Sequence, residues 1–410
     1  MKWRWQLLLW LMIIFLLLPP FNVMGINSVW ILEMVVLGVG LVNAWYKEDQ
    51  LRDFLHHWEV LWLIVFIVLI TLSGLVIIEW LPFIKFITKF WLGFWLMWLA
   101  YVYGDNRKLI IKLMLFSLLM RVWLESLLYI QILADKVVKI FYESLSKSII
   151  ANLGRNRTMI GFFGEPLIIV GIYFWFTEKK AWKWLGGASV FGAMVIAFMS
   201  NWRGRFLTVV LISSIGVLWG IIVGNKNKKK WVKHFVIWSG IFGGVLLMLN
   251  NILTLKQGYS VVDRLLNKNY REDVVPVEWR KQLFEESLEM AKYSWLGVGG
   301  GQFYVHTNHK NTIRVFNHGI EDASKYGPHN LFFQFLAETG WLGLGWLIIG
   351  LGLMFVKDIK DCWLLRMNSI RCAFIMMFWG IILEAQFYPV VGWEFFVLFF
   401  GLRGLLLRRV

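Results

Sequence analysis

Long apolar runs alternate with short polar breaks along most of the chain. About 20 apolar residues allow a helix to cross the hydrocarbon core of a bilayer. On that criterion the pattern predicts about 12 helices, near residues 5–23, 28–46, 60–80, 84–103, 109–130, 166–177, 184–200, 206–224, 234–252, 329–356, 372–388 and 392–406. No small-x-small cleavage site follows the first run, so we predict an uncleaved helix there. The predicted fold class is an all-α polytopic membrane protein.

The cations between the apolar runs predict the orientation of the chain, because cytoplasmic loops of membrane proteins are enriched in Lys and Arg. With a cytoplasmic N-terminus, the inner loops and the C-terminal tail carry Lys47, Arg52, Arg107, Lys108, Lys179, Lys180, Lys183, Lys226, Lys228, Lys229, Lys230, Lys233, Lys357, Lys360, Arg366, Arg371, Arg408 and Arg409. The outer turns near 24–28 and 386–392 carry no Lys or Arg. We therefore predict that both termini are cytoplasmic and that residues 131–165 and 253–328 lie on the opposite side.

The long hydrophilic block at 253–328 divides the chain into an N-terminal bundle (1–252, helices 1–9), an extracytoplasmic loop and C-terminal helices (329–410). Apolar residues in this loop follow helical spacing: Trp279, Leu283, Phe284, Leu288, Ala291 and Trp295. Such spacing predicts an amphipathic helix that packs on the membrane part or lies in the interface. Because long loops with their own helical pattern are usually functional, we place the working surface on this side.

Composition narrows the classes of protein that fit. Hydrophobic residues make up 59% of the 410 residues, whereas soluble domains are about 45–50% apolar. The net charge of +16 is a feature of many nucleic-acid-binding proteins. Here the cations sit in breaks between membrane runs, so we expect no nucleic acid partner. The only cysteines, Cys362 and Cys372, fall near a predicted inner loop and indicate neither a disulfide framework nor a metal cluster.

Several cations break the topological pattern. Arg203 and Arg205 lie in a short turn that the map places outside. They either snorkel to the interface or bind an anion, because a guanidinium matches phosphate oxygens. Arg280, taken alone, is better explained as an exposed cation of the amphipathic helix. The following turn, Leu-Gly-Val-Gly-Gly-Gly at 296–301, could present backbone N–H groups to an anion.

His329 stands at the start of the tenth run, directly after Pro328. The first turn of a helix has free N–H groups and the positive end of the dipole, which favours a neutral imidazole and suits a base. An ordinary hydrogen-bonded histidine is the commoner case. Spacing places three further polar residues on one face of this helix: Asn330, Gln334 and Glu338. For Glu338, interhelical hydrogen bonding is the simpler interpretation.

The stretch 328–343, Pro-His-Asn-Leu-Phe-Phe-Gln-Phe-Leu-Ala-Glu-Thr-Gly-Trp-Leu-Gly, resembles the signature of the O-antigen ligase and O-antigen polymerase family. That signature is His-Asn, several apolar residues, a Glu and two spaced glycines. Trp202-Arg203-Gly204 resembles the family's Ser-Arg-Gly turn, with Trp in place of Ser. Arg280, followed by the turn at 296–299, resembles its arginine helix and Leu-Gly-x-Gly turn. Residues 161–166 are similar to an element that opens a middle span, and the resemblance covers about 155–350.

The resemblance implies a GT-C-like glycosyltransferase of the bacterial inner membrane, inverting and metal-independent, with its active site on the periplasmic or extracellular side. It implies no cofactor. The implied partners are an undecaprenyl-diphosphate-linked oligosaccharide, an acceptor glycan or glycolipid, the bilayer and other polysaccharide assembly proteins. Carried onto this chain, the catalytic residues are His329, Arg280 and Arg203; the diphosphate-binding residues are Arg203, Arg205 and Arg280; and the supporting residues are Asn330, Gln334 and Glu338.

Other classes of function remain open. A transporter or flippase for a polysaccharide precursor or small anion would use membrane carboxylates such as Glu338 and Glu384 along its path. The chain shows no internal repeat and no paired broken helices, which argues against this alternative. The third class of function is that of a non-catalytic subunit of a polysaccharide assembly complex. The sequence distinguishes neither ligase from polymerase nor the sugar and its linkage.

Overall fold

The computed structural model describes residues 22–23, 26–133, 165–178, 180–199, 203–223, 236, 240, 271–310, 328, 330–364, 370–387 and 393–408. These residues are helical apart from turns and one antiparallel pair of two-residue strands, β1 (Asn22–Val23) and β2 (Ile26–Asn27). The helices are α2 (Ser28–Tyr46), α3 (Glu48–Leu55), α4 (Trp58–Leu72), η1 (Ser73–Val76), α5 (Trp80–Tyr103), α6 (Arg107–Leu133), η2 (Glu165–Leu167), α9 (Ile168–Thr177), α10 (Lys180–Met199), α11 (Arg203–Val223), α14 (Arg271–Tyr293), α15 (Phe303–Lys310), α16 (Leu331–Leu364), α17 (Ile370–Glu384) and α18 (Trp393–Leu407).

The predicted all-helical class is confirmed, and most predicted runs coincide with a helix to within a few residues. The run at 234–252, except residues 236 and 240, and most of the run at 5–23 lie outside the described residues. Asn22 and Val23 form β1 and so do not continue the first run as a helix. Among the described residues, three helices are long and apolar enough to cross a membrane: Trp58–Val76, Trp80–Tyr103 and Leu331–Trp363. The larger number of spans stays a prediction.

Hydropathy missed two short polar helices, α3 and α15. Of the α3 side chains only Phe54 is buried. An apolar window cannot detect a helix of eight residues that buries so little, because the apolar residues are too few to raise the local mean.

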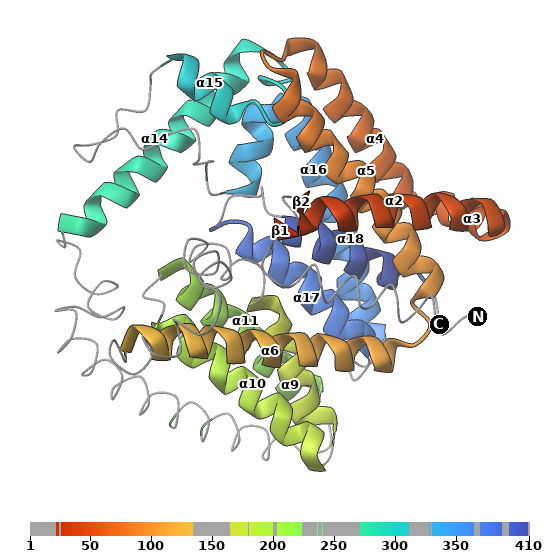
Figure 1. Ribbon diagram of the computed structural model, residues 1–410, viewed down its shortest axis with the longest axis vertical. Coiled ribbons are helices and arrows are strands. Elements are labelled where there is room, and N and C mark those ends of the chain that lie inside the picture. The colour runs from red at the N-terminus through yellow and green to blue at the C-terminus, as the bar shows by residue number, and fades with distance from the viewer. Residues whose placement is uncertain are drawn as a thin grey trace. The chain divides into compact units, whose positions relative to one another are not determined.

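The chain forms two compact units. The first contains α6, η2, α9, α10, α11 and α17, and α9 is its centre, with residues 168–175 buried against the neighbouring helices. Figure 1 shows α6, α9 and α10 side by side. Asn106 caps α6 by accepting a hydrogen bond from the Leu109 amide at 3.1 Å. Lys112 lies over the Trp182 ring and Lys183 over the Trp175 ring, each at 4.9 Å from the centroid.

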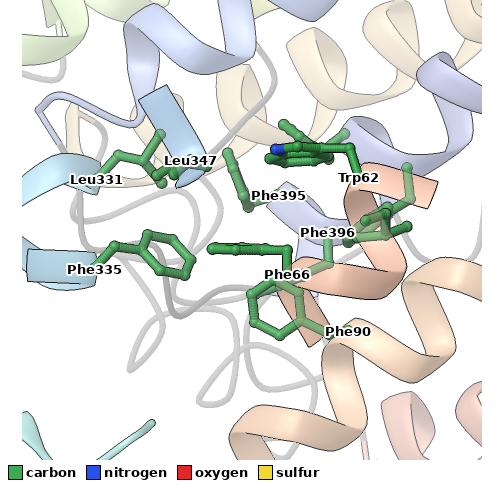
Figure 2. A pocket seen from close by; sticks show the side chains of 11 residues that line it. Trp62, Phe66, Phe90, Leu331, Phe335, Leu347, Phe395 and Phe396 are labelled. Carbon is green, nitrogen blue, oxygen red and sulfur yellow. The ribbon is translucent and has the colours of Figure 1, made fainter. Parts of the chain in front are cut away.

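The second unit contains α3, α4, η1, α5, α14, α15, α18, most of α2 and nearly all of α16. Its core is a cluster of aromatic rings where α4, α5, α16 and α18 meet (Figure 2). The Phe66 and Phe335 rings lie 5.4 Å apart, and those of Phe90 and Phe396 lie 5.0 Å apart edge to face. The cavity between the rings measures about 20 Å³. That is room for little more than one water-sized sphere, so the cluster is a packed core and holds α16 in place.

Candidate functional site

Helix α16 is broken at Gly340, where the backbone adopts φ 66° and ψ −166°. A residue at positive φ cannot continue a right-handed helix, and glycine adopts this conformation at little cost. The break removes the normal partners of the carbonyls one turn earlier, those of Ala337 and Glu338. These buried carbonyls need other donors, and the break therefore creates a docking point for another segment.

The docking segment is the glycine turn, defined here as residues 294–302. Its Val298 amide donates to the Ala337 carbonyl at 2.9 Å, and its Gly299 amide donates to the Glu338 carbonyl at 3.0 Å. In return, the Leu342 amide donates to the Trp295 carbonyl at 3.4 Å. The glycine turn thus replaces the helical hydrogen bonds that the break removes.

Only glycine fits where the two backbones touch. A Cβ atom on Gly340 would lie 2.1 Å from the Trp295 carbonyl oxygen, and one on Gly297 would lie 2.3 Å from the Ala337 oxygen. Gly297 also has positive φ, at 70°. The two glycine motifs of the sequence, far apart in the chain, are therefore the two halves of one contact.

The other side of the glycine turn is fixed to the connection between α4 and α5. The Gly300 amide donates to Ser73 Oγ at 3.1 Å. The side chain of Gln302, fully buried, accepts from the Ile78 and Glu79 amides at 3.1 and 3.0 Å and donates to the Glu79 carbonyl at 2.6 Å. Sequence reasoning missed Ser73 and Gln302, because no spacing or motif links two polar residues so distant in the chain.

This arrangement corrects the interpretation of the turn as an anion site. The amides of residues 296–300 and 302 all donate to protein oxygens. The turn instead positions the helix that precedes it.

Helix α14 docks along the first turns of α16 and runs in the same direction. The Phe284 and Phe333 rings stack at 4.3 Å with 13° between their planes. Further along α14, Ala291 packs in one apolar cluster with Leu336. The glycine turn, which follows α14 in the chain, then contacts α16 near Gly340. Figure 1 shows α14 and α15 beside the start of α16. The predicted amphipathic helix is therefore present and packs on α16.

The docking sets the position of Arg280. Arg280 is exposed and precedes Phe284 by four residues, or one helical turn. Asn330 precedes the stacked partner Phe333 by three residues and caps α16, its Oδ1 accepting from the Phe332 and Phe333 amides at 3.0 and 3.2 Å. The described part of the site thus brings Arg280 to the level of the N-terminus of α16. His329 directly precedes Asn330 in the chain and lies outside the described residues.

Gln334 and Glu338 are buried in α16, with 2% and 0% exposure. Around the carboxylate lie the backbone of Gly301 and Phe303, where α15 begins, and the Gln334 side chain. A carboxylate near a helix N-terminus is stabilised by the dipole. This position suits a supporting role for Glu338, away from solvent.

The remaining predicted cations are placed only in part. Arg203 begins α11 in the first compact unit. The side chains of Arg203 and Arg205 lie outside the described residues. Their grouping with Arg280 around one diphosphate stays a prediction.

A second polar cluster, which sequence reasoning did not predict, lies near the other end of α16. Arg403 donates to Glu59 and to Asp358, each at 2.6 Å, and Lys357 donates to Glu59 at 2.6 Å. Glu59, Asp358 and Arg403 are almost fully buried. We call this set the charge cluster. It joins α4, α16 and α18, and its two cations balance its two carboxylates.

Long apolar helices, exposed apolar side chains along them and a capped polar helix end define the chain as a helical membrane protein. Residues 188–348 match the family model described as O-antigen ligase. The resemblance of the sequence motifs is thereby confirmed. The match runs from α10 into α16 and includes the arginines at 203, 205 and 280, the His-Asn pair and both glycine motifs. A search of curated proteins finds no match.

Proposed function

We propose that the chain is a membrane glycosyltransferase of the O-antigen ligase and polymerase type. It transfers a glycan from an undecaprenyl-diphosphate carrier to an acceptor sugar, on the extracytoplasmic side and without a metal ion. The observation that carries this proposal is the parallel docking of α14 on α16. Arg280 lies one turn before Phe284, and His329 lies four residues before its stacked partner Phe333. The family domain covers both positions.

The chemistry assigns separate roles to the cation and the imidazole. An acceptor hydroxyl oxygen attacks the anomeric carbon while the bond between that carbon and the phosphate oxygen breaks, and the electron pair stays on the diphosphate. His329 takes the hydroxyl proton as general base. Arg280, with Arg203 and Arg205 as further candidates, stabilises the charge that builds on the departing diphosphate. Attack opposite the leaving group inverts the anomeric centre.

The hydrogen bonds of Asn330 and Leu331 support the supporting role proposed for Asn330. Asn330 holds the first turn of α16 through its cap, and its Nδ2 donates to the Gln386 carbonyl at 3.5 Å. The Leu331 amide donates to the Ala385 carbonyl at 2.9 Å. These bonds fix the chain on the C-terminal side of His329, and a catalytic group needs such fixed neighbours to keep its geometry.

The test incubates the purified protein with a lipid-linked oligosaccharide and separates the products on a gel. We expect His329→Ala and Arg280→Ala each to lower glycan joining at least about 100-fold, the usual contribution of a general base or of one charge-stabilising donor. Lys281→Ala is the matched control, because Lys281 is the next cation on α14 and its side chain is 77% exposed. A ladder of products identifies a polymerase, and a single transfer to a lipid acceptor identifies a ligase.

The proposal fails if His329→Ala and Arg280→Ala accumulate in the membrane and join glycans like the unaltered protein. A transporter would tolerate both changes and would lose function on substitution of Glu338. Membrane abundance, measured for every variant, separates loss of chemistry from loss of folding.

A further inference from the structure

The first part of α16, residues 331–339, folds back on the second part at the glycine break. We call this first part the half-helix. Leu331 lines the same small cavity as Leu347 (Figure 2), and Leu336 and Leu344 belong to one apolar cluster. In a continuous helix, Leu331 and Leu347 would lie about 24 Å apart, because each residue adds about 1.5 Å. The half-helix therefore runs back alongside the residues that follow the break.

The half-helix begins well inside the depth of the neighbouring spans. The Phe335 ring lies 5.4 Å from the Phe66 ring and 6.0 Å from the Phe90 ring. Phe66 and Phe90 stand near the middle of α4 and α5, two candidate membrane spans. The glycine turn, by contrast, is bonded to Ser73, near the outer end of the α4 span. Because Leu347 comes seven residues after the break, the half-helix begins about 10 Å below the break, toward the middle of the spans.

Polar groups lie at this depth. The Leu331 amide donates to the Ala385 carbonyl at 2.9 Å, and Asn330 Nδ2 donates to the Gln386 carbonyl at 3.5 Å. Asn330 and Gln386 are both half-buried. Polar side chains within a bilayer face protein or a water-filled space, because contact with lipid is costly. Their partial exposure therefore indicates water beside the start of the half-helix.

Helix α14 gives independent evidence for water on this side of the half-helix. Leu331 faces the aromatic cavity, whereas Phe333, on the opposite face, stacks on Phe284 of α14. Next to Phe284 in the helix, Lys281 and Glu285 form an ion pair at 3.7 Å, and their side chains are 77% and 61% exposed. Lipid disfavours charged groups at this depth. The half-helix therefore has a dry face toward the aromatic cavity and a wet side toward α14.

We propose that the half-helix is re-entrant, and that water reaches its start along the side of α14. Exposed apolar side chains continue along the α4 span to Leu75 and Val76, so lipid covers that side of the molecule up to the level of the break. The start of the half-helix then lies about 10 Å below the outer end of the lipid-covered surface. A hydrated sugar and its diphosphate reach the site in this water-filled space; this consequence rests on the proposed function, whereas the position of the half-helix does not.

Two distances, measured by pulsed electron paramagnetic resonance on the full chain in phospholipid nanodiscs, test the fold-back. Spin labels on Gln386→Cys and Ile359→Cys report how far the start of the half-helix lies from the far end of α16. Labels on Leu342→Cys and Ile359→Cys are the matched control, because both positions follow the break and lie about 25 Å apart along one helix. We expect the two distances to be similar. A helix that continued through the break would make the first distance about 17 Å longer.

Collisions of single labels with oxygen and with a water-soluble nickel chelate test the access of water. The label on Gln386→Cys is compared with one on Ile348→Cys, since Ile348 follows Leu347 and lies at a similar depth. Ile348 is 51% exposed among the apolar residues of the second part of α16. We expect nickel collisions to dominate at 386 and oxygen collisions to dominate at 348. Phe387→Cys replaces Gln386→Cys if the latter does not accumulate.

Either of two results overturns the proposal. If the distance from 386 to 359 exceeds that from 342 to 359 by about 17 Å, the half-helix projects away from the span. If the label at 386 has the collision pattern of the label at 348, water does not reach this depth. The native Cys362 and Cys372 are buried, and a chain without introduced cysteines measures any label that they take up. Neither readout uses glycan joining, so failure of the proposed function leaves both results valid.

Discussion

The two ends of α16 are held by different kinds of interaction. Near Gly340, backbone groups of the glycine turn satisfy the carbonyls of a broken helix, and the buried carboxyl group of Glu338 makes no salt bridge with a described residue. In the charge cluster, side chains make the contacts, and each carboxylate forms an ion pair with Arg403. Backbone docking uses main-chain groups, whereas the charge cluster uses side chains that are committed to each other. The end that carries the proposed site is the end held by backbone.

The two modes of attachment also differ in their sensitivity to substitution. A buried ion pair contributes little relative to a well-packed apolar replacement, but removal of one partner leaves an uncompensated charge. A backbone contact depends on close approach, so an added methyl group disrupts it even when no charge changes. The variants below separate these two kinds of failure.

The largest effect is expected for Arg403→Met. This change leaves Glu59 and Asp358 buried without the Arg403 guanidinium, and removal of one partner of a buried pair costs about 3–5 kcal/mol. We expect loss of most folded protein, measured by thermal unfolding in detergent. Replacing all three buried groups together, Glu59→Gln, Asp358→Asn and Arg403→Met, should recover part of the stability, because no carboxylate is then left buried without its cation and the Lys357 side chain, 34% exposed, reaches solvent. Unchanged thermal stability of Arg403→Met alone would contradict the assigned pairing.

Gly340→Ala tests the backbone contact between α16 and the glycine turn. Its Cβ would lie 2.1 Å from the Trp295 oxygen, and the required positive φ costs a non-glycine residue about 1–3 kcal/mol. We expect the glycine turn to detach, with faster hydrogen exchange at the Val298 and Gly299 amides and loss of glycan joining. The charge cluster should stay intact.

Gly345→Ala is the matched control for this substitution. Gly345 lies in the same helix, and a Cβ there would meet no atom within 4 Å. Alanine is favoured over glycine inside a helix by about 1 kcal/mol, so this variant should be at least as stable as the unaltered protein. If both variants behave alike, the backbone contact has no special role.

The sequence predicted the helices well and their attachments poorly. Hydropathy located α4, α5 and α16, because about 20 apolar residues leave few alternatives in a bilayer. The motif around Gly340 indicated a functional region, which the family match supports. The pairing of Gly340 with Gly297 was not predicted, because a contact between two backbones leaves no side-chain pattern to detect.

The charge cluster escaped prediction for another reason. Lys357 was interpreted as a topology signal, and Glu59 and Arg403 were not interpreted at all, because each stands alone within an apolar stretch. In the chain, Lys357 lies 298 positions and Arg403 lies 344 positions after Glu59. Such distances give no local spacing, so only the packing of α4, α16 and α18 brings these residues together.

The smallest effect is expected for Glu338→Gln, which compares the two buried carboxylates directly. Glutamine keeps the volume of Glu338 and replaces a buried carboxyl group that makes no salt bridge with a described residue. The change alters the interactions with the backbone of Gly301 and Phe303 and with the Gln334 side chain, and the interaction with the N-terminus of α15 contributes typically about 0.3–1 kcal/mol. We expect a small fall in thermal stability and near-normal glycan joining. Glu59→Gln, the matched substitution in the charge cluster, disrupts contacts to both Arg403 and Lys357 and should destabilise the protein far more. Equal losses of stability would show that Glu338 has a partner as strong as Arg403. Complete loss of function in a stably folded Glu338→Gln would instead give this carboxylate a direct role, as a transport path requires.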